Sequence, residues 1–135
     1  MTSNPKIRVE RDLCHAPEKV WRALTQSEFV TQWWASGSIE ATVGHQFVLD
    51  LGDQGLAPGE VLEADPHSLF VIQLHQIWTL SWVLEASGSG CCLVLFHEGF
   101  ELDAADPQVA QQQLSAHWNE KRLPQLEQVL QMMQD

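Results

Sequence analysis

Residues 9–34, VERDLCHAPEKVWRALTQSEFVTQWW, decide the fold of this chain, because a strand pattern is followed there by two short helix patterns. Residues 6–14 mostly alternate apolar with charged side chains, which is typical of a half-buried β-strand. Pro17 fits the first turn of a helix, and apolar residues follow it at helical spacing. A second short helix is predicted to begin near Ser27, whose hydroxyl is suited to capping it, and to carry Trp34.

Strand patterns fill the middle of the chain. Each is a short run in which apolar and polar residues alternate, and turn residues such as Asp65 and Pro66 separate neighbouring runs. Together with the first strand they predict an antiparallel sheet of about six or seven strands. The runs are residues 46–51, 59–64, 68–75, 78–85 and 91–101.

After residue 107 the apolar pattern changes to the period of a helix. Pro124 is predicted to kink this helix, because proline has no N–H to donate to the carbonyl of Glu120. A sheet with one apolar face and a single long helix to cover it is expected to curl round that helix. The predicted fold class is therefore α+β, a curved antiparallel sheet around a long C-terminal helix, with two short helices after the first strand. The apolar stripe of the helix contains Val109, Leu114, His117, Trp118, Leu123, Leu126, Val129, Leu130 and Met133.

The length and composition indicate one globular domain. With 135 residues and 15.2 kDa, we expect a single domain over residues 1–135. No apolar run is long enough to cross a bilayer, and residues 1–13 lack the apolar core of a secretory signal, so we expect a cytoplasmic protein. Cys14, Cys91 and Cys92 form neither a disulfide framework nor a zinc-binding spacing, which predicts free thiols and no metal.

Acidic residues dominate the charge of the chain. Eighteen Asp and Glu against 7 Lys and Arg give a net charge of −11. This charge repels phosphate backbones and anionic lipid headgroups, so we expect neither nucleic-acid nor membrane binding. Lys and Arg are absent from residues 23–120, which leaves Arg8, Arg11, Lys121 and Arg122 as the only cations available to meet a buried anion. A ligand held by this fold is therefore expected to be neutral or weakly cationic.

Four segments besides residues 9–34 carry a family likeness: VGHQFVLDL at 43–51, GEVLEADPHSLF at 59–70, LSWVLEASGSGCCLVLFHEGFE at 80–101, and HW at 117–118. Together they resemble the START-like (SRPBCC) superfamily over about residues 7–131. The resemblance is closest to members similar to the C-terminal domain of the heat-shock-protein-90 ATPase activator. It implies a helix-grip fold with a cavity between the curved sheet and the long helix, which many members use for apolar ligands.

The resemblance leaves three functions open. The one we favour is binding of a small, largely apolar neutral molecule in the cavity, with no catalytic residue, metal or cofactor. The first alternative is an enzyme of the polyketide cyclase/aromatase kind, which would need an oxyanion stabiliser and a proton shuttle. The second is a co-chaperone or protein-interaction module. Since the chain shows no match to the separate N-terminal domain of the co-chaperone, direct chaperone activation is not expected.

Tryptophan and histidine supply the candidate cavity residues. The chain has 6 Trp and no Tyr, and these large rings either fill the core or bound a cavity. His97 shares a strand face with Leu93 and Leu95, where it is a polar contact in the cavity, a general acid or base, or a satisfied buried histidine. His117 is placed at the helical wall. The predicted cavity residues are Trp33, Trp34, Phe47, Leu49, Val61, Phe70, Ile72, Trp78, Trp82, Leu95, His97, Leu114 and Trp118.

Overall fold

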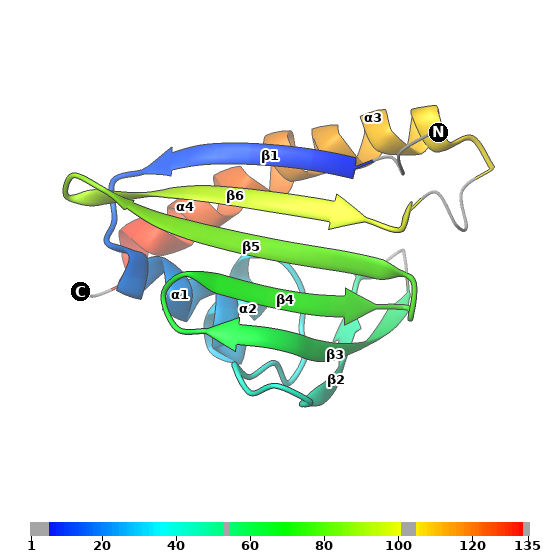
Figure 1. The fold of residues 1–135 in the computed structure, drawn as a ribbon, viewed down its shortest axis with the longest axis horizontal. Helices are drawn as coiled ribbons and strands as arrows, with labels where there is room; N and C mark the ends of the chain where they lie inside the picture. Colours follow the sequence, from blue (N-terminus) through cyan, green and yellow to red (C-terminus); the bar gives the residue numbers. More distant parts are fainter. Residues whose placement is uncertain (1–5, 53–54, 101–104, 134–135) are drawn as a thin grey trace.

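The computed structural model describes residues 6–52, 55–100 and 105–133, and within them six strands form one antiparallel sheet (Figure 1). The order across the sheet is β1-β6-β5-β4-β3-β2, so β1 is the strand that pairs with a partner distant in sequence. Glu101, the predicted end of the last strand, lies outside the described residues, and β6 ends at Glu98. The strands are β1 (Lys6–Leu13), β2 (Gln46–Asp50), β3 (Leu56–Asp65), β4 (Leu69–Leu74), β5 (Trp78–Ser87) and β6 (Gly90–Glu98).

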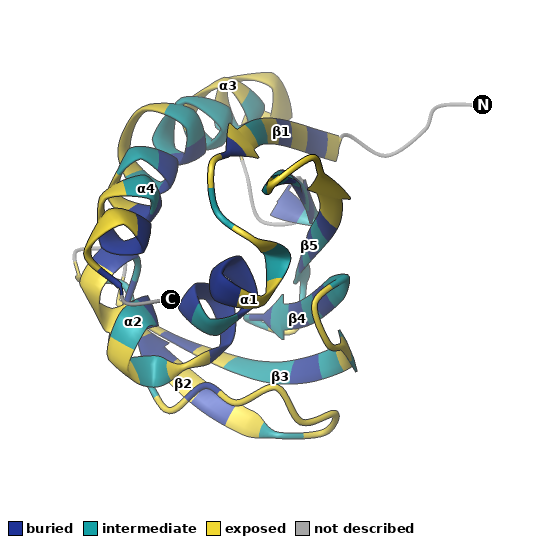
Figure 2. Cartoon of the chain, turned by 90° about the vertical axis from the view of Figure 1, so that its left-hand side faces the viewer, coloured by how far each residue is buried: buried dark blue, intermediate teal, exposed yellow. Residues whose placement is uncertain are grey.

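The sheet is curved, and the helices occupy its concave side (Figure 2). Alternating side chains explain why: on β4, Phe70, Ile72 and Leu74 are buried, while the residues between them are half-buried. The buried positions of the other strands join the same core cluster, which also takes in the apolar faces of the helices. The predicted helix-grip architecture is therefore confirmed.

Two short helices, α1 (Pro17–Thr25) and α2 (Ser27–Trp33), form the inner layer of the grip, in contact with α4 (Leu123–Met132). The prediction that Ser27 caps α2 is wrong, because Gln26 occupies the N-cap position and makes no side-chain hydrogen bond there. The Ser27 hydroxyl instead donates to the carbonyl of Ile39 at 3.1 Å and accepts from its N–H at 2.9 Å. The serine thus anchors the loop that follows α2.

The C-terminal helix consists of α3 (Pro107–His117), a π-helical turn η3 (Trp118–Arg122) and α4. The irregularity lies directly before Pro124, where the sequence predicts it. In the π-helical pattern the N–H that would reach the Asn119 carbonyl would belong to Pro124, so the Asn119 carbonyl has no π-helical donor. Arg11 Nη2 of β1 donates to this carbonyl in its place.

The first part of the C-terminal helix is packed differently from the second. Val109 is 45% exposed and α3 contains no buried residue, so the prediction that Val109 belongs to the buried stripe is wrong. Val109 is exposed because α3 runs beside β1 at the edge of the sheet, whereas α4 packs on α1 and α2. None of the helices in the described ranges is long and apolar enough to cross a membrane.

Candidate functional site

A pocket of about 330 Å³ lies between one end of the sheet and the C-terminal helix. Its walls come from the end of α2, the chain after β2, the adjacent ends of β5 and β6, and the helix from α3 into the π-helical turn. Three of the lining side chains are tryptophans, and we name it the tryptophan pocket. It is lined by Trp34, Leu51, Trp78, His97, Leu114, His117, Trp118, Lys121 and Arg122.

The ends of two strands bring Trp78 and His97 into this pocket. Leu80 of β5 pairs with His97 of β6, which places Trp78 two positions further along the same face. The two ring centroids are 4.7 Å apart. Gly99 follows with a φ of 89°, and a β-carbon there would overlap the carbonyl of Ile77. Only glycine therefore allows β6 to end this close to the β4–β5 turn.

His97 is the buried polar group of the pocket, with 0% of its surface exposed. Trp118 Nε1 donates a hydrogen bond to His97 Nδ1 at 3.2 Å. Since Nδ1 accepts this bond, the ring proton is assigned to Nε2. Burial lowers the pKa of His97 to about 4, so the imidazole is neutral at physiological pH. His97 is not a fully satisfied core histidine, because its Nε2 has no hydrogen-bond partner among the described residues.

The aromatic wall of the pocket is continuous with the core. The ring of Trp34 stacks on Trp33 at a centroid distance of 5.6 Å and lies 5.4 Å from Trp118. Trp33 and Trp82 lie behind this wall, each 1% exposed, with ring centroids 5.6 Å apart. Trp33 Nε1 is held by the carbonyl of Ala23 at 2.8 Å. These edge and stacked contacts make the wall rigid, which favours binding of a flat apolar group.

Two cations border the pocket although the chain as a whole is acidic. Arg122 Nη1 donates to the carbonyls of Trp33 and Trp34, at 3.2 and 3.4 Å, where the C-terminal end of α2 favours a positive charge. Lys121 is exposed beside it. Burial, together with the charges of Arg122 and Lys121, lowers the pKa of His117. Among the described residues that line the pocket, Lys121 and Arg122 are the charged ones.

The predicted cavity residues fall into two groups. One group lines the tryptophan pocket, whereas the other is packed in the core with exposures of 0% to 6%. Side chains of α1 and α2 fill the space beside the core group, because these helices occupy the concave face of the sheet and pack against it. Contact of any of them with a ligand stays a prediction. The pocket group is Trp34, Trp78, His97, Leu114 and Trp118, and the core group is Trp33, Phe47, Leu49, Val61, Phe70, Ile72, Trp82 and Leu95.

Three lining residues are not among those predicted from the sequence: Leu51, Lys121 and Arg122. For the two cations a signal exists, because they follow Trp118 at the three- and four-residue spacing of one helix face. They are two of the cations that the sequence leaves available to a buried anion. Leu51 comes directly after β2, and no local pattern marks it. His117 also lines the pocket.

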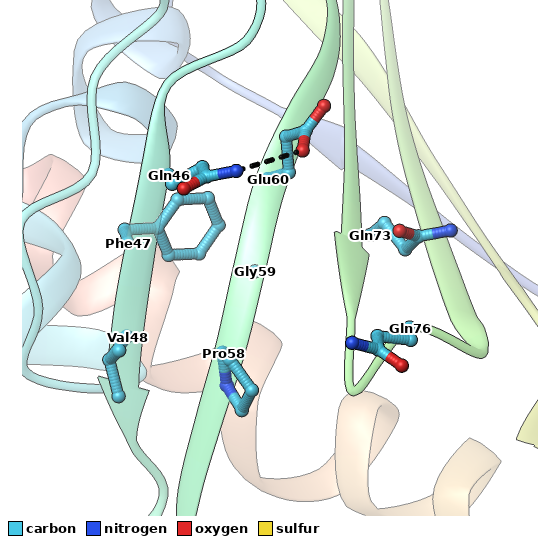
Figure 3. Close-up of a pocket in the computed structure, with 8 residues that line it drawn as sticks. All are labelled: Gln46, Phe47, Val48, Pro58, Gly59, Glu60, Gln73 and Gln76. Carbon is cyan, nitrogen blue, oxygen red and sulfur yellow. Dashed lines mark hydrogen bonds between the residues drawn. The ribbon is translucent and has the colours of Figure 1, made fainter.

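A second hollow of about 450 Å³ lies across β2, β3 and the β4–β5 turn (Figure 3). Gly59 lies in its lining, and the Phe47 ring packs so closely over this glycine that a β-carbon there would come within 2.6 Å of the ring. Gln46 Nε2 donates to Glu60 Oε1 at 3.5 Å, so two polar side chains of the hollow pair with each other, and its described lining residues form no aromatic wall like that of the tryptophan pocket. Across residues 6–52, 55–100 and 105–133, the His, Cys, Asp and Glu side chains form no group able to hold a metal ion. The tryptophan pocket is therefore the better candidate site.

A curved sheet that grips a C-terminal helix defines the class of START-like (SRPBCC) domains. The family model described as "Activator of Hsp90 ATPase homolog 1-like protein" matches residues 15–131. The chain belongs to this family. No curated protein is significantly similar to it.

Three of the solved structures that match share the fold over almost their whole length. Protein MLL2253 from Mesorhizobium loti is 27% identical with a TM-score of 0.84, covering 97% of this chain and 100% of that one. Protein BH1534 from Bacillus halodurans is 23% identical with a TM-score of 0.85, covering 96% and 99%. The Aha1 dimer from Colwellia psychrerythraea is 19% identical with a TM-score of 0.78, covering 93% and 96%. At such identities the last two show the fold alone.

Proposed function

We propose that the protein binds a small, largely apolar molecule in the tryptophan pocket. The observation that supports it best is a buried polar atom, His97 Nε2, that lacks a partner among the described residues in a pocket walled by aromatic rings. Ligand sites combine an apolar lining with a few such polar groups. The expectation of a neutral ligand loses its basis, because Lys121 and Arg122 line the pocket. The proposed ligand therefore carries a polar end.

The proposal is tested by mass spectrometry of the purified full chain under native conditions. We expect a bound small molecule that is released on denaturation. Leu114→Trp should abolish this mass difference, because Leu114 lines the pocket and the larger ring would fill it. The matched control is Val109→Trp, on the same helix but 45% exposed, which should retain the molecule. Equal retention by both variants would place any bound molecule elsewhere.

Contact with a chaperone of the Hsp90 class is the second candidate function, favoured by the family to which the chain belongs. We place either function in a reducing compartment such as the cytoplasm, because Cys14, Cys91 and Cys92 are free thiols. Size-exclusion chromatography of the chain with an Hsp90 tests the contact. Co-elution that Leu114→Trp leaves unchanged would support a protein-interaction surface separate from the pocket, and separate elution would contradict the contact.

A further inference from the structure

Two buried ring N–H groups of the tryptophan pocket have no hydrogen-bond partner among the described residues, Trp78 Nε1 and His97 Nε2. An indole N–H can only donate. His97 Nε2 also donates, because Nδ1 of the same ring accepts from Trp118. Buried polar groups in folded proteins are normally paired, and an unpaired donor lowers stability. Both groups therefore require an acceptor that the described part of the chain does not supply.

The charged side chains of the pocket point to the same chemistry. Arg122 uses Nη1 to bind the end of α2, but its buried Nε has no partner among the described residues. Lys121 adds an exposed ammonium group. His117, with its lowered pKa, is the one neutral ring among the lining residues still able to accept a hydrogen bond. Among the described lining residues, the side chains thus offer more free donors than free acceptors.

The apolar part of the lining limits the shape of the ligand. Trp34 and Trp118 present rings with centroids 5.4 Å apart, and Leu114 lies on the helical side. Rigid aromatic walls bind flat rings through stacked and edge contacts. The acceptor of the ligand must therefore be attached to a compact aromatic body.

We infer that the tryptophan pocket binds a small aromatic carboxylate. Its ring lies against Trp34 and Trp118, its oxygens accept from Trp78 Nε1 and His97 Nε2, and Lys121 supplies the compensating positive charge. A carboxylate removed from water needs such a set of donors and a cation, and hydrogen bonds to an ionised acceptor are stronger than those to a neutral one. The inference rests on the proposed function and reverses the charge preference expected from the sequence.

Three probes that share one ring system test this inference on the full chain. Isothermal titration calorimetry at pH 8 compares 2-naphthoate, its neutral methyl ester and 2-naphthylmethylammonium. We expect naphthoate to bind at least about tenfold more tightly than the ammonium probe, with the ester between them. An ammonium probe or ester that binds as tightly as naphthoate overturns the inference while the proposed function stands. Failure of all three probes to bind contradicts both.

Two variants assign the effect to the pocket. Trp78→Phe keeps a ring but removes the N–H, and should weaken naphthoate binding about tenfold and the ammonium probe by a clearly smaller factor. Lys121→Gln should weaken naphthoate more than the ester. The matched control is Trp21→Phe, because Trp21 packs on Phe70 away from the pocket. Circular dichroism verifies that each variant is folded. Equal effects of Trp78→Phe and Trp21→Phe on naphthoate binding overturn the inference.

Discussion

Trp118 links the core to the pocket at the scale of single residues. Its side chain is 3% exposed and its ring lies 5.5 Å from that of Trp82, while its N–H fixes the tautomer of His97. One residue thus serves both packing and the polar chemistry of the site. A change at this position is expected to alter both.

Replacing Trp118 with Ala should lower the free energy of unfolding by about 3–5 kcal/mol, because a buried indole is lost and a void remains. Trp118→Phe keeps most of the ring and should lose less, with a contribution of about 1–3 kcal/mol from the unpaired His97 Nδ1. Urea unfolding followed by circular dichroism measures both. If the Ala variant lost less than about 1 kcal/mol, the ring could not be a core element.

His97 should make stability depend on pH. In the folded protein burial lowers its pKa from 6.5 to about 4, so below pH 6.5 the unfolded chain takes up a proton that the folded chain does not. The free energy of unfolding is therefore highest above pH 6.5 and falls as the pH is lowered towards 4, by at most about 1.4 kcal/mol per pH unit. Urea unfolding at successive pH values measures this slope.

The variant His97→Gln should remove most of this slope, since glutamine does not titrate. The pKa of His117 is lowered too, so it contributes in the same direction and His117→Gln is the matched comparison. We expect the larger change in slope from His97, because it is the more deeply buried of the two rings. An unchanged slope in His97→Gln would show that this ring is charged or solvated in the folded state.

The junction of β1 with the C-terminal helix sets the geometry at the scale of elements. Pro124 deprives the Asn119 carbonyl of its helical donor, and Arg11 from β1 donates to it. The opposite side of the same turn is held by Arg122, which binds the end of α2. Hydrogen bonds therefore hold the π-helical turn that carries Trp118 to β1 and to the end of α2.

A double-mutant cycle between Arg11 and Pro124 tests this junction. Arg11→Met should lower the free energy of unfolding by about 1–3 kcal/mol, because the Asn119 carbonyl loses its donor. In a Pro124→Ala background the new N–H can serve that carbonyl, so the same substitution should cost about 1 kcal/mol less. Urea unfolding of the four proteins gives the coupling. Additive effects would mean that the arginine and the proline act independently.

The net charge of −11 acts at the scale of the whole molecule. Self-repulsion among the acidic side chains destabilises the compact state, and salt screens it. Ion pairs such as Lys6–Glu98 at 3.9 Å and Arg8–Glu10 at 3.0 Å are exposed. Exposed ion pairs add little to the stability of the fold, so screening them with salt costs little. Repulsion should therefore determine the response of the folded protein to salt.

We expect the Tm to rise when sodium chloride is increased from low to physiological concentration. We choose sodium chloride and not a sulfate salt, because sulfate also strengthens apolar burial and would raise the Tm by that separate effect. Differential scanning calorimetry at fixed pH measures the change. A Tm that is flat or falls over this range would show that repulsion does not limit stability.

The sequence by itself determined the secondary structure, the sheet face that is buried and the family. Local periodicity carries this information: Pro17 opens α1, and alternation marks Phe70 and Ile72 as inward on β4. The positions of Trp78 and His97 on the inner face could likewise be predicted, because strand side chains alternate with a period of two.

Only the tertiary structure decided where the pocket lies and what charge surrounds it. The hydrogen bond from Trp118 to His97, that from Arg11 to Asn119 and those from Arg122 to the end of α2 join residues far apart in the chain. No local pattern encodes such partners, because they depend on how curved sheet and helix meet. The same packing fills the expected central cavity with α1 and α2 and leaves space at one end, beside two cations.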